Sequence, residues 1–147
     1  GVGWGGKLVA RVWGGSVARG PQAELGWYHI ERNDPTLIST GPWFQYHWDH
    51  WQNPPNSVEI ARTALAPQAF TFGRTLALQF HPEIDSHVLD LWLEMDGGCA
   101  EVEGEGMSVE ALREETRRQE ASSNKRAYDL VDQFLDRIAG APVQRVD

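Results

Sequence analysis

The sequence predicts an α/β domain. Two observations carry this prediction: short β-favouring runs fill the middle of the chain, and runs with helical spacing of apolar residues follow them. A third is size, because 147 residues fit one domain and can bury a core. With 41% hydrophobic and 23% charged residues, the composition is that of an ordinary soluble protein, and no apolar run approaches membrane-spanning length.

Turn-forming residues mark the boundaries of the expected elements. Gly14-Gly15 ends the first helix, Gly20-Pro21 is expected to form a turn, and Gly73-Arg74 forms a tight connection between two strands. The last helix is expected to divide in two near residues 122–124 and to end at Gly140 and Pro142. The predicted helices cover residues 7–13, 86–95 and 108–139, and the predicted strands lie in residues 16–19, 24–31, 42–51, 57–63, 69–72 and 76–80.

Charge and cysteine content exclude some classes of function. The net charge of −8 argues against nucleic acid as a partner, because no basic stripe is present to neutralise phosphates. Cys99 is the only cysteine, so an internal disulfide is impossible and a reducing, cytoplasmic location is expected. Its neighbours Asp96, Glu101 and Glu103 do not form the electropositive setting that a nucleophilic thiolate needs. We therefore expect Cys99 to be an incidental loop residue.

The segment 75–85, TLALQFHPEID, holds the strongest catalytic signal. A short buried strand ends where His81, Pro82 and Glu83 begin. Two residues apart on extended backbone, His81 and Glu83 point to the same side, and Pro82 fixes the angle between them. A carboxylate placed in this way can hold one imidazole nitrogen and leave the other free to take a proton. The plainer alternative is a histidine that merely ends a strand.

The string L-x-L-Q-F-H-P-E, followed by a helix rich in Leu and Trp, resembles the last catalytic segment of class I glutamine amidotransferases, in particular the GMP-synthase type. The resemblance implies a flavodoxin-like, three-layer α/β fold. It also implies a Cys-His-Glu triad that releases ammonia from the side-chain amide of glutamine. In that triad His81 would be the base and Glu83 its orienting acid.

The opening GVGWGGK matches the nucleophile elbow of the same family, G-x-C-x-G-x-Q, at Gly1 and Gly5. Gly3 stands where the resemblance implies the catalytic cysteine, and Lys7 stands where it implies a glutamine that lies against the substrate. The backbone N–H of Trp4 would donate to the oxyanion. A phosphate-binding glycine loop is the alternative, but no strand precedes the string. The chain would then begin at the elbow, and the domain would be incomplete at its N-terminus.

The aromatic stretch 42–51 matches the family's H-x-D segment beside the glutamine pocket, at His47 and Asp49, with Pro54-Pro55 after it. The resemblance implies that His47 and Asp49 help to bind the substrate. A metal site formed by His47, Asp49 and His50 is the rival interpretation. Because no second pair of ligands has suitable spacing, we expect neither a metal nor another cofactor.

Together these features predict two parts. Residues 1–95 would be the C-terminal part of an amidotransferase domain, and residues 96–147 an acidic loop with a helical extension docked on it. The expected function is that of an amidotransferase-like protein, inactive because Gly3 replaces the nucleophile. The alternatives are a non-catalytic binding homologue and a related γ-glutamyl hydrolase or peptidase. The expected partners are glutamine or a related small amide and a synthetase or acceptor subunit, with neither nucleic acid nor membrane.

Overall fold

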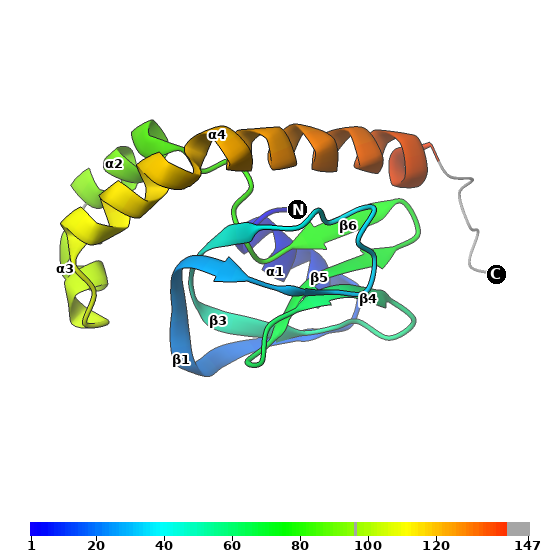
Figure 1. Cartoon of the computed structure of the whole chain (residues 1–147). Coiled ribbons are helices and arrows are strands. Elements are labelled where there is room, and N and C mark those ends of the chain that lie inside the picture. Colours follow the sequence, from blue (N-terminus) through cyan, green and yellow to red (C-terminus); the bar gives the residue numbers. More distant parts are fainter. Residues whose placement is uncertain (96, 141–147) are drawn as a thin grey trace.

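The computed structural model describes residues 1–95 and 97–140 (Figure 1). Strands lie at its centre, and one long helix, α4, runs along their upper side in this view. In chain order the elements are α1 (Trp4–Val12), β1 (Ser16–His29), β2 (Glu31–Arg32), β3 (Pro42–Gln52), β4 (Val58–Arg62), β5 (Pro67–Phe72), β6 (Thr75–Leu78), α2 (Ser86–Glu94), α3 (Gly98–Gly104), α4 (Val109–Phe134) and the π-helix η1 (Leu135–Ala139).

The strands form a four-stranded sheet in the order β2-β4-β5-β6 and a long two-stranded ribbon, β1-β3. The pairs of named strands are antiparallel. A parallel bridge joins Val2 to Leu78, and the N–H of Gly3 donates to the carbonyl of Leu78 at 2.8 Å. The first residues therefore run beside β6 before the chain turns into α1.

Alternation of side chains along β5 and β6 gives the molecule three layers. Leu76 and Leu78 of β6 share one apolar cluster with Leu130 of α4 and Ile138 of η1. Ala77, which lies between them in sequence, shares another cluster with Ala10 of α1. Successive residues of a strand point to opposite faces. The sheet thus lies between α1 on one face and α4-η1 on the other.

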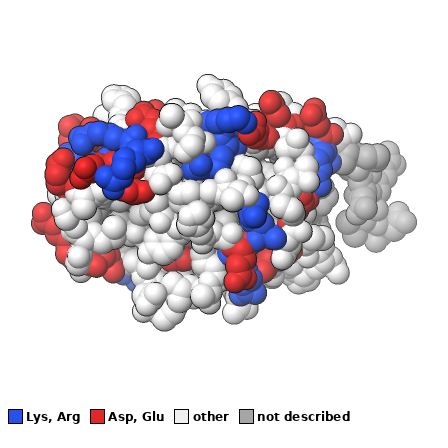
Figure 2. Space-filling view, viewed as in Figure 1, with Lys and Arg blue, Asp and Glu red and all other residues white. Residues whose placement is uncertain are grey.

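A third apolar cluster joins the end of the ribbon to the helices. Leu25 of β1 and Phe44 of β3 pack there with Leu89 of α2, Val102 of α3 and Leu112 of α4. The N-terminal ends of α2 and α4 are capped by side chains: Asp85 accepts from Val88 N at 2.7 Å, and Ser108 accepts from Ala111 N at 3.2 Å. In Figure 2, acidic and basic side chains are interspersed along α4.

The predicted α/β fold is confirmed, and the elements α1, β3 to β6 and α2 lie close to their predicted ranges. Gly73 turns the chain between β5 and β6 with a φ of +55°. The flavodoxin-like label remains a prediction, because the pairing of the named strands is antiparallel. Among the described residues, none of the helices is both long enough and apolar enough to cross a membrane.

Three predictions about the elements were wrong. Gly20-Pro21 is not a turn but lies within β1, where the pairing with β3 shifts register between Arg19 and Glu24. The expected loop after residue 96 contains α3, since Gly97, with a φ of 91°, starts a helix whose Val102 is buried among the other helices. Asp96 and residues 141–147, including Pro142, lie outside the described residues.

The predicted break in the last helix is the third error, because α4 runs unbroken through residues 122–124. The hydroxyl of Ser122 donates to the carbonyl of Gln119 at 3.0 Å, and that of Ser123 donates to the carbonyl of Glu120 at 3.2 Å. Serine side chains can bond back to the preceding turn of a helix, so they do not compete with it here.

Candidate active site

A tight turn at Gly3 begins the site. Its φ of 53° and ψ of −115° lie outside the regions that L-residues favour. A Cβ atom on Gly3 would lie 2.5 Å from Cε1 and 3.0 Å from Nε2 of His81. The imidazole therefore occupies the space into which a side chain at position 3 would project. Glycine is required here both by the backbone angle and by the neighbouring ring.

His81 is held from three sides. Its backbone N–H donates to the carbonyl of Phe44 at 2.8 Å, and its Nδ1 lies 2.7 Å from Oε1 of Glu83. The ring also packs edge-on against Trp92, with 4.8 Å between centroids. Since Nδ1 faces the carboxylate, Nε2 is the nitrogen directed toward the turn at Gly3. The contact between His81 and Glu83 is the one that the spacing of these two residues predicts. Their roles as a base and its orienting acid stay a prediction.

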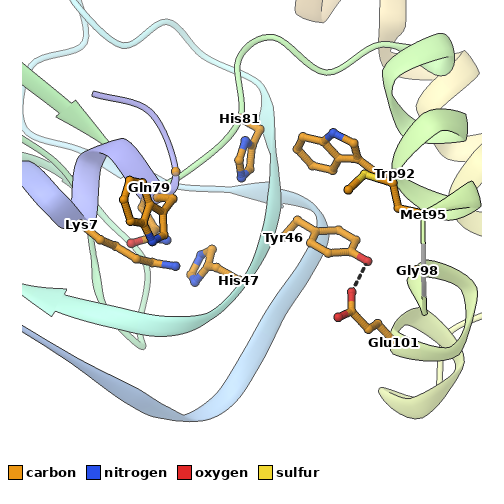
Figure 3. A pocket seen from close by; sticks show the side chains of 11 residues that line it. Lys7, Tyr46, His47, Gln79, His81, Trp92, Met95, Gly98 and Glu101 are labelled. Atoms are coloured by element: carbon orange, nitrogen blue, oxygen red, sulfur yellow. Dashed lines mark hydrogen bonds between the residues drawn. The ribbon is translucent and has the colours of Figure 1, made fainter.

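A cavity of about 370 Å³ opens beside Gly3 and His81 (Figure 3). Lys7 and Gln79 lie on one side of it, and Tyr46, Trp92 and Met95 lie on the other. The Tyr46 hydroxyl donates to the Glu101 carboxylate at 2.8 Å, which ties β3 to α3 at the rim. Such a volume is in the range of small-molecule sites.

Gln79 contributes an unusual feature to this cavity. Its side chain is fully buried, and neither amide atom has a hydrogen-bond partner among the described residues. A buried amide without partners costs free energy. A ligand with complementary donors and acceptors would recover that cost.

Burial lowers the pKa of two basic groups in the cavity. It lowers the pKa of Lys7, which the charge of Asp49 opposes. It also lowers the pKa of His47 to about 3, together with the positive charges of Lys7, His50 and His81. A backbone hydrogen bond with Asp49 acts in the opposite direction, but burial outweighs it. His47 is therefore neutral near pH 7.

The structure brings most of the predicted site residues together. The cavity is lined by Gly3, Trp4, Lys7, His47 and His81, and Glu83 lies behind His81. Asp49 is elsewhere, in an adjacent groove that also contacts Lys7. Whether these residues bind a substrate stays a prediction.

Several lining residues were not foreseen as site residues. Gln79 could have been found, because it lies two residues before His81 in the segment that follows β6. The others come from β3, from α2 and its C-terminal end, and from α3, whose packing around the cavity no local pattern reveals. They are Tyr46, Trp92, Met95, Gly98 and Glu101.

The fold of this chain is similar to that of several proteins of known structure. A glutamine amidotransferase from Thermotoga maritima superposes with a TM-score of 0.82 at 24% identity, over 92% of this chain and 61% of that one. A glutamine amidotransferase from Methylobacillus flagellatus gives 0.82 at 21% identity, over 99% of this chain and 64% of that one. These two likenesses establish the fold.

In sequence, the chain is 33% identical over 111 residues to the GMP synthase [glutamine-hydrolyzing] of Aeropyrum pernix. The chain is a GMP-synthase-type glutamine amidotransferase domain. The match covers 66% of this domain and 22% of the relative, so the domain spans about a fifth of that protein. No model of a known protein family matches the amidotransferase domain.

Proposed function

We propose that this domain binds glutamine or a related small amide in the cavity beside His81 and does not hydrolyse it. The observation that carries the proposal is the turn at Gly3: it faces the His81–Glu83 pair but has no side chain. Amide hydrolysis through a covalent intermediate needs a nucleophile, a base and donors to the oxyanion. Here the base and its orienting carboxylate are 2.7 Å apart, and the nucleophile is missing.

Binding is supported by groups that a small amide would satisfy. Gln79 lines the cavity with its carbonyl oxygen and NH₂ group unpaired but buried, so its side chain would have to turn to present them to a ligand. A carboxamide has the same two kinds of group, so the pair can exchange two hydrogen bonds. Lys7 adds a cation that attracts a carboxylate, as found on a free amino acid. The Trp4 N–H, at the start of α1, remains the proposed oxyanion donor.

The test is titration calorimetry of the 147-residue chain with L-glutamine, combined with an assay for released ammonia. We expect saturable binding and no ammonia above the level given by the His81→Ala variant. Replacing Gln79 with Leu should weaken binding about five- to tenfold, the worth of roughly one hydrogen bond. The matched control is Gln52→Leu, since Gln52 is exposed at the end of β3. Ammonia release that depends on His81, or the absence of any binding, would overturn the proposal.

The alternative of a γ-glutamyl hydrolase or peptidase requires the same missing nucleophile, so Gly3 weighs against it equally. We further infer that the partner is a synthetase or acceptor subunit. The curated relative is named a glutamine-hydrolysing GMP synthase, and a putative GMP synthase subunit from Thermoplasma acidophilum gives a TM-score of 0.52 at 24% identity, over 69% of this chain and 56% of that one. The proposal includes a cytoplasmic location, where the free thiol of Cys99 would stay reduced.

A further inference from the structure

A cluster of three ligand-type side chains lies behind the cavity, in the β1-β3 ribbon. It contains Glu24 of β1 with His47 and His50 of β3, and one ligand atom from each lies within 4.8 Å of the others. Oε2 of Glu24 is 3.4 Å from Nε2 of His47 and 4.0 Å from Nε2 of His50. Glu24 and His50 do not line the cavity beside His81.

The charge of Glu24 has no basic side chain from Lys or Arg to balance it within this cluster. The glutamate is 1% exposed, and Gln68 donates one hydrogen bond to Oε2 at 2.8 Å. Burying a carboxylate is costly unless it is paired or coordinates a metal. The two imidazoles are the groups that face it, and a cation held between the three would balance the charge.

His50 gives a second, independent indication. Its side chain is only 10% exposed, yet Nε2 has no hydrogen-bond partner among the described residues. The ring is fixed in place by Gly20, where a Cβ atom would lie 2.5 Å from Cε1. An immobilised imidazole with an unpaired nitrogen directed at a carboxylate is a preformed ligand.

The ribbon explains how two histidines three residues apart can converge. In a regular strand, side chains 47 and 50 would point to opposite faces. Here the register between β1 and β3 shifts between Arg19 and Glu24, opposite this part of β3. Such irregularities bend a strand and redirect its side chains. A surface cavity of about 320 Å³ is lined by Gly20 and His50, so the cluster meets this cavity at His50.

We propose that Glu24, His47 and His50 form a zinc site that clamps β1 to β3 across this irregularity. Two zinc bonds of about 2.1 Å at a tetrahedral angle place their ligand atoms about 3.4 Å apart. The Glu24–His47 distance already has this value, but Nε2 of His47 also lies 2.9 Å from Oε1 of Gln45 and would have to give up that contact to bind the metal. Nε2 of His50, now 4.0 Å from Glu24, would need to approach by about 0.6 Å. Two histidines and one glutamate are an established ligand set for zinc, with the fourth position left for water. Gln68 would orient the carboxylate from outside.

The experiment starts from chain freed of metal with a chelator and then dialysed. Titration with Zn²⁺ should show one site per chain, and Zn²⁺ should raise the melting temperature. Glu24→Gln and His50→Gln should each weaken binding at least about tenfold, since each removes a direct ligand. The matched controls are His29→Gln, an exposed histidine on β1, and Cys99→Ser, the free thiol. Neither control should change the affinity.

Two results would overturn the zinc site. The first is that wild type shows no stoichiometric zinc binding tighter than about 10 µM, a weak limit for a preformed protein site. The second is that Glu24→Gln, His50→Gln and wild type bind zinc equally. X-ray absorption of the zinc-loaded wild type decides the matter even if a variant fails to fold. Two imidazoles and one carboxylate around the metal are expected, and a sulfur ligand would point to Cys99 instead. Because the readouts do not involve glutamine, they are independent of the proposed function.

Discussion

At the scale of single residues, position 3 decides what this domain can do. The backbone there has a φ of 53°, and the His81 ring fills the space beside it. A cysteine would have to adopt a conformation that favours glycine and push the imidazole away. The glycine at position 3 and the present position of His81 therefore go together, and under the proposed function we expect that Gly3→Cys alone does not create an active site.

Gly73 is a matched comparison for Gly3, because it has a φ of +55° but open space around its Cβ position. We expect Gly73→Ala to cost about 1 kcal/mol of unfolding free energy, from backbone strain alone. Gly3→Ala should cost at least about 1 kcal/mol more, because of the contact with His81. Urea denaturation measures both.

In a His81→Ala background the extra cost of Gly3→Ala should disappear. An equal penalty with and without the imidazole would show that the ring is not the obstacle. Gly3→Cys should be destabilised like Gly3→Ala and release no ammonia from glutamine.

At the scale of elements, α4 and η1 hold the molecule together through contacts at several points. Trp27 of β1 donates to Thr116 at 3.0 Å, and the buried guanidinium of Arg126 donates to the carbonyl of Pro42 at 2.7 Å. At the far end, Arg137 of η1 donates to both carboxylate oxygens of Asp34, at 3.2 and 2.7 Å. The unbroken helix matters because it spaces these contacts along the strands.

The Asp34–Arg137 pair makes stability depend on pH. Hydrogen bonding to Arg137 is the main cause that lowers the pKa of Asp34 below 3.8. A carboxyl whose pKa is lowered by folding stabilises the native state above its unfolded pKa, and this stabilisation is lost as the pH falls. We expect the unfolding free energy of wild type to exceed that of Arg137→Gln by about 0.5–1 kcal/mol at pH 6, and this difference to shrink as the pH falls below 3.8.

Urea denaturation across that pH range measures the difference. The control is Arg117→Gln, which removes an exposed pair with Glu110 at 3.6 Å on α4 and should change little at any pH. A difference between wild type and Arg137→Gln that is constant from pH 6 to pH 3 would refute the role of the Asp34 carboxylate.

At the scale of the whole molecule, residues on both sides of the predicted division at residue 95 share the same apolar clusters. Leu130 and Ile138 pack in one cluster with β4 to β6, and Val102 and Leu112 pack in another with β1 and β3. Residues on both sides of the division therefore bury each other. We expect the chain to unfold as one cooperative unit.

The tryptophans offer a test of this expectation, because all seven lie before residue 96 whereas most helical residues lie in α3, α4 and η1. Urea unfolding followed by tryptophan fluorescence reports on residues 1–95, and far-ultraviolet circular dichroism reports mainly on the later helices. The two midpoints should coincide. Separate transitions would support two independently folding parts.

The sequence by itself determined the local features: the α/β class, the turn at Gly73, and the pairing of His81 with Glu83 two residues away. Each depends on neighbours in the chain, so a short pattern contains the necessary information. Only the tertiary structure decided that Gly3 meets the His81 ring, that Gln79 and Trp92 line the same cavity, and that Glu24 joins His47 and His50. These contacts are set by strand register and helix packing, which bring together residues far apart in sequence and leave no periodic signal.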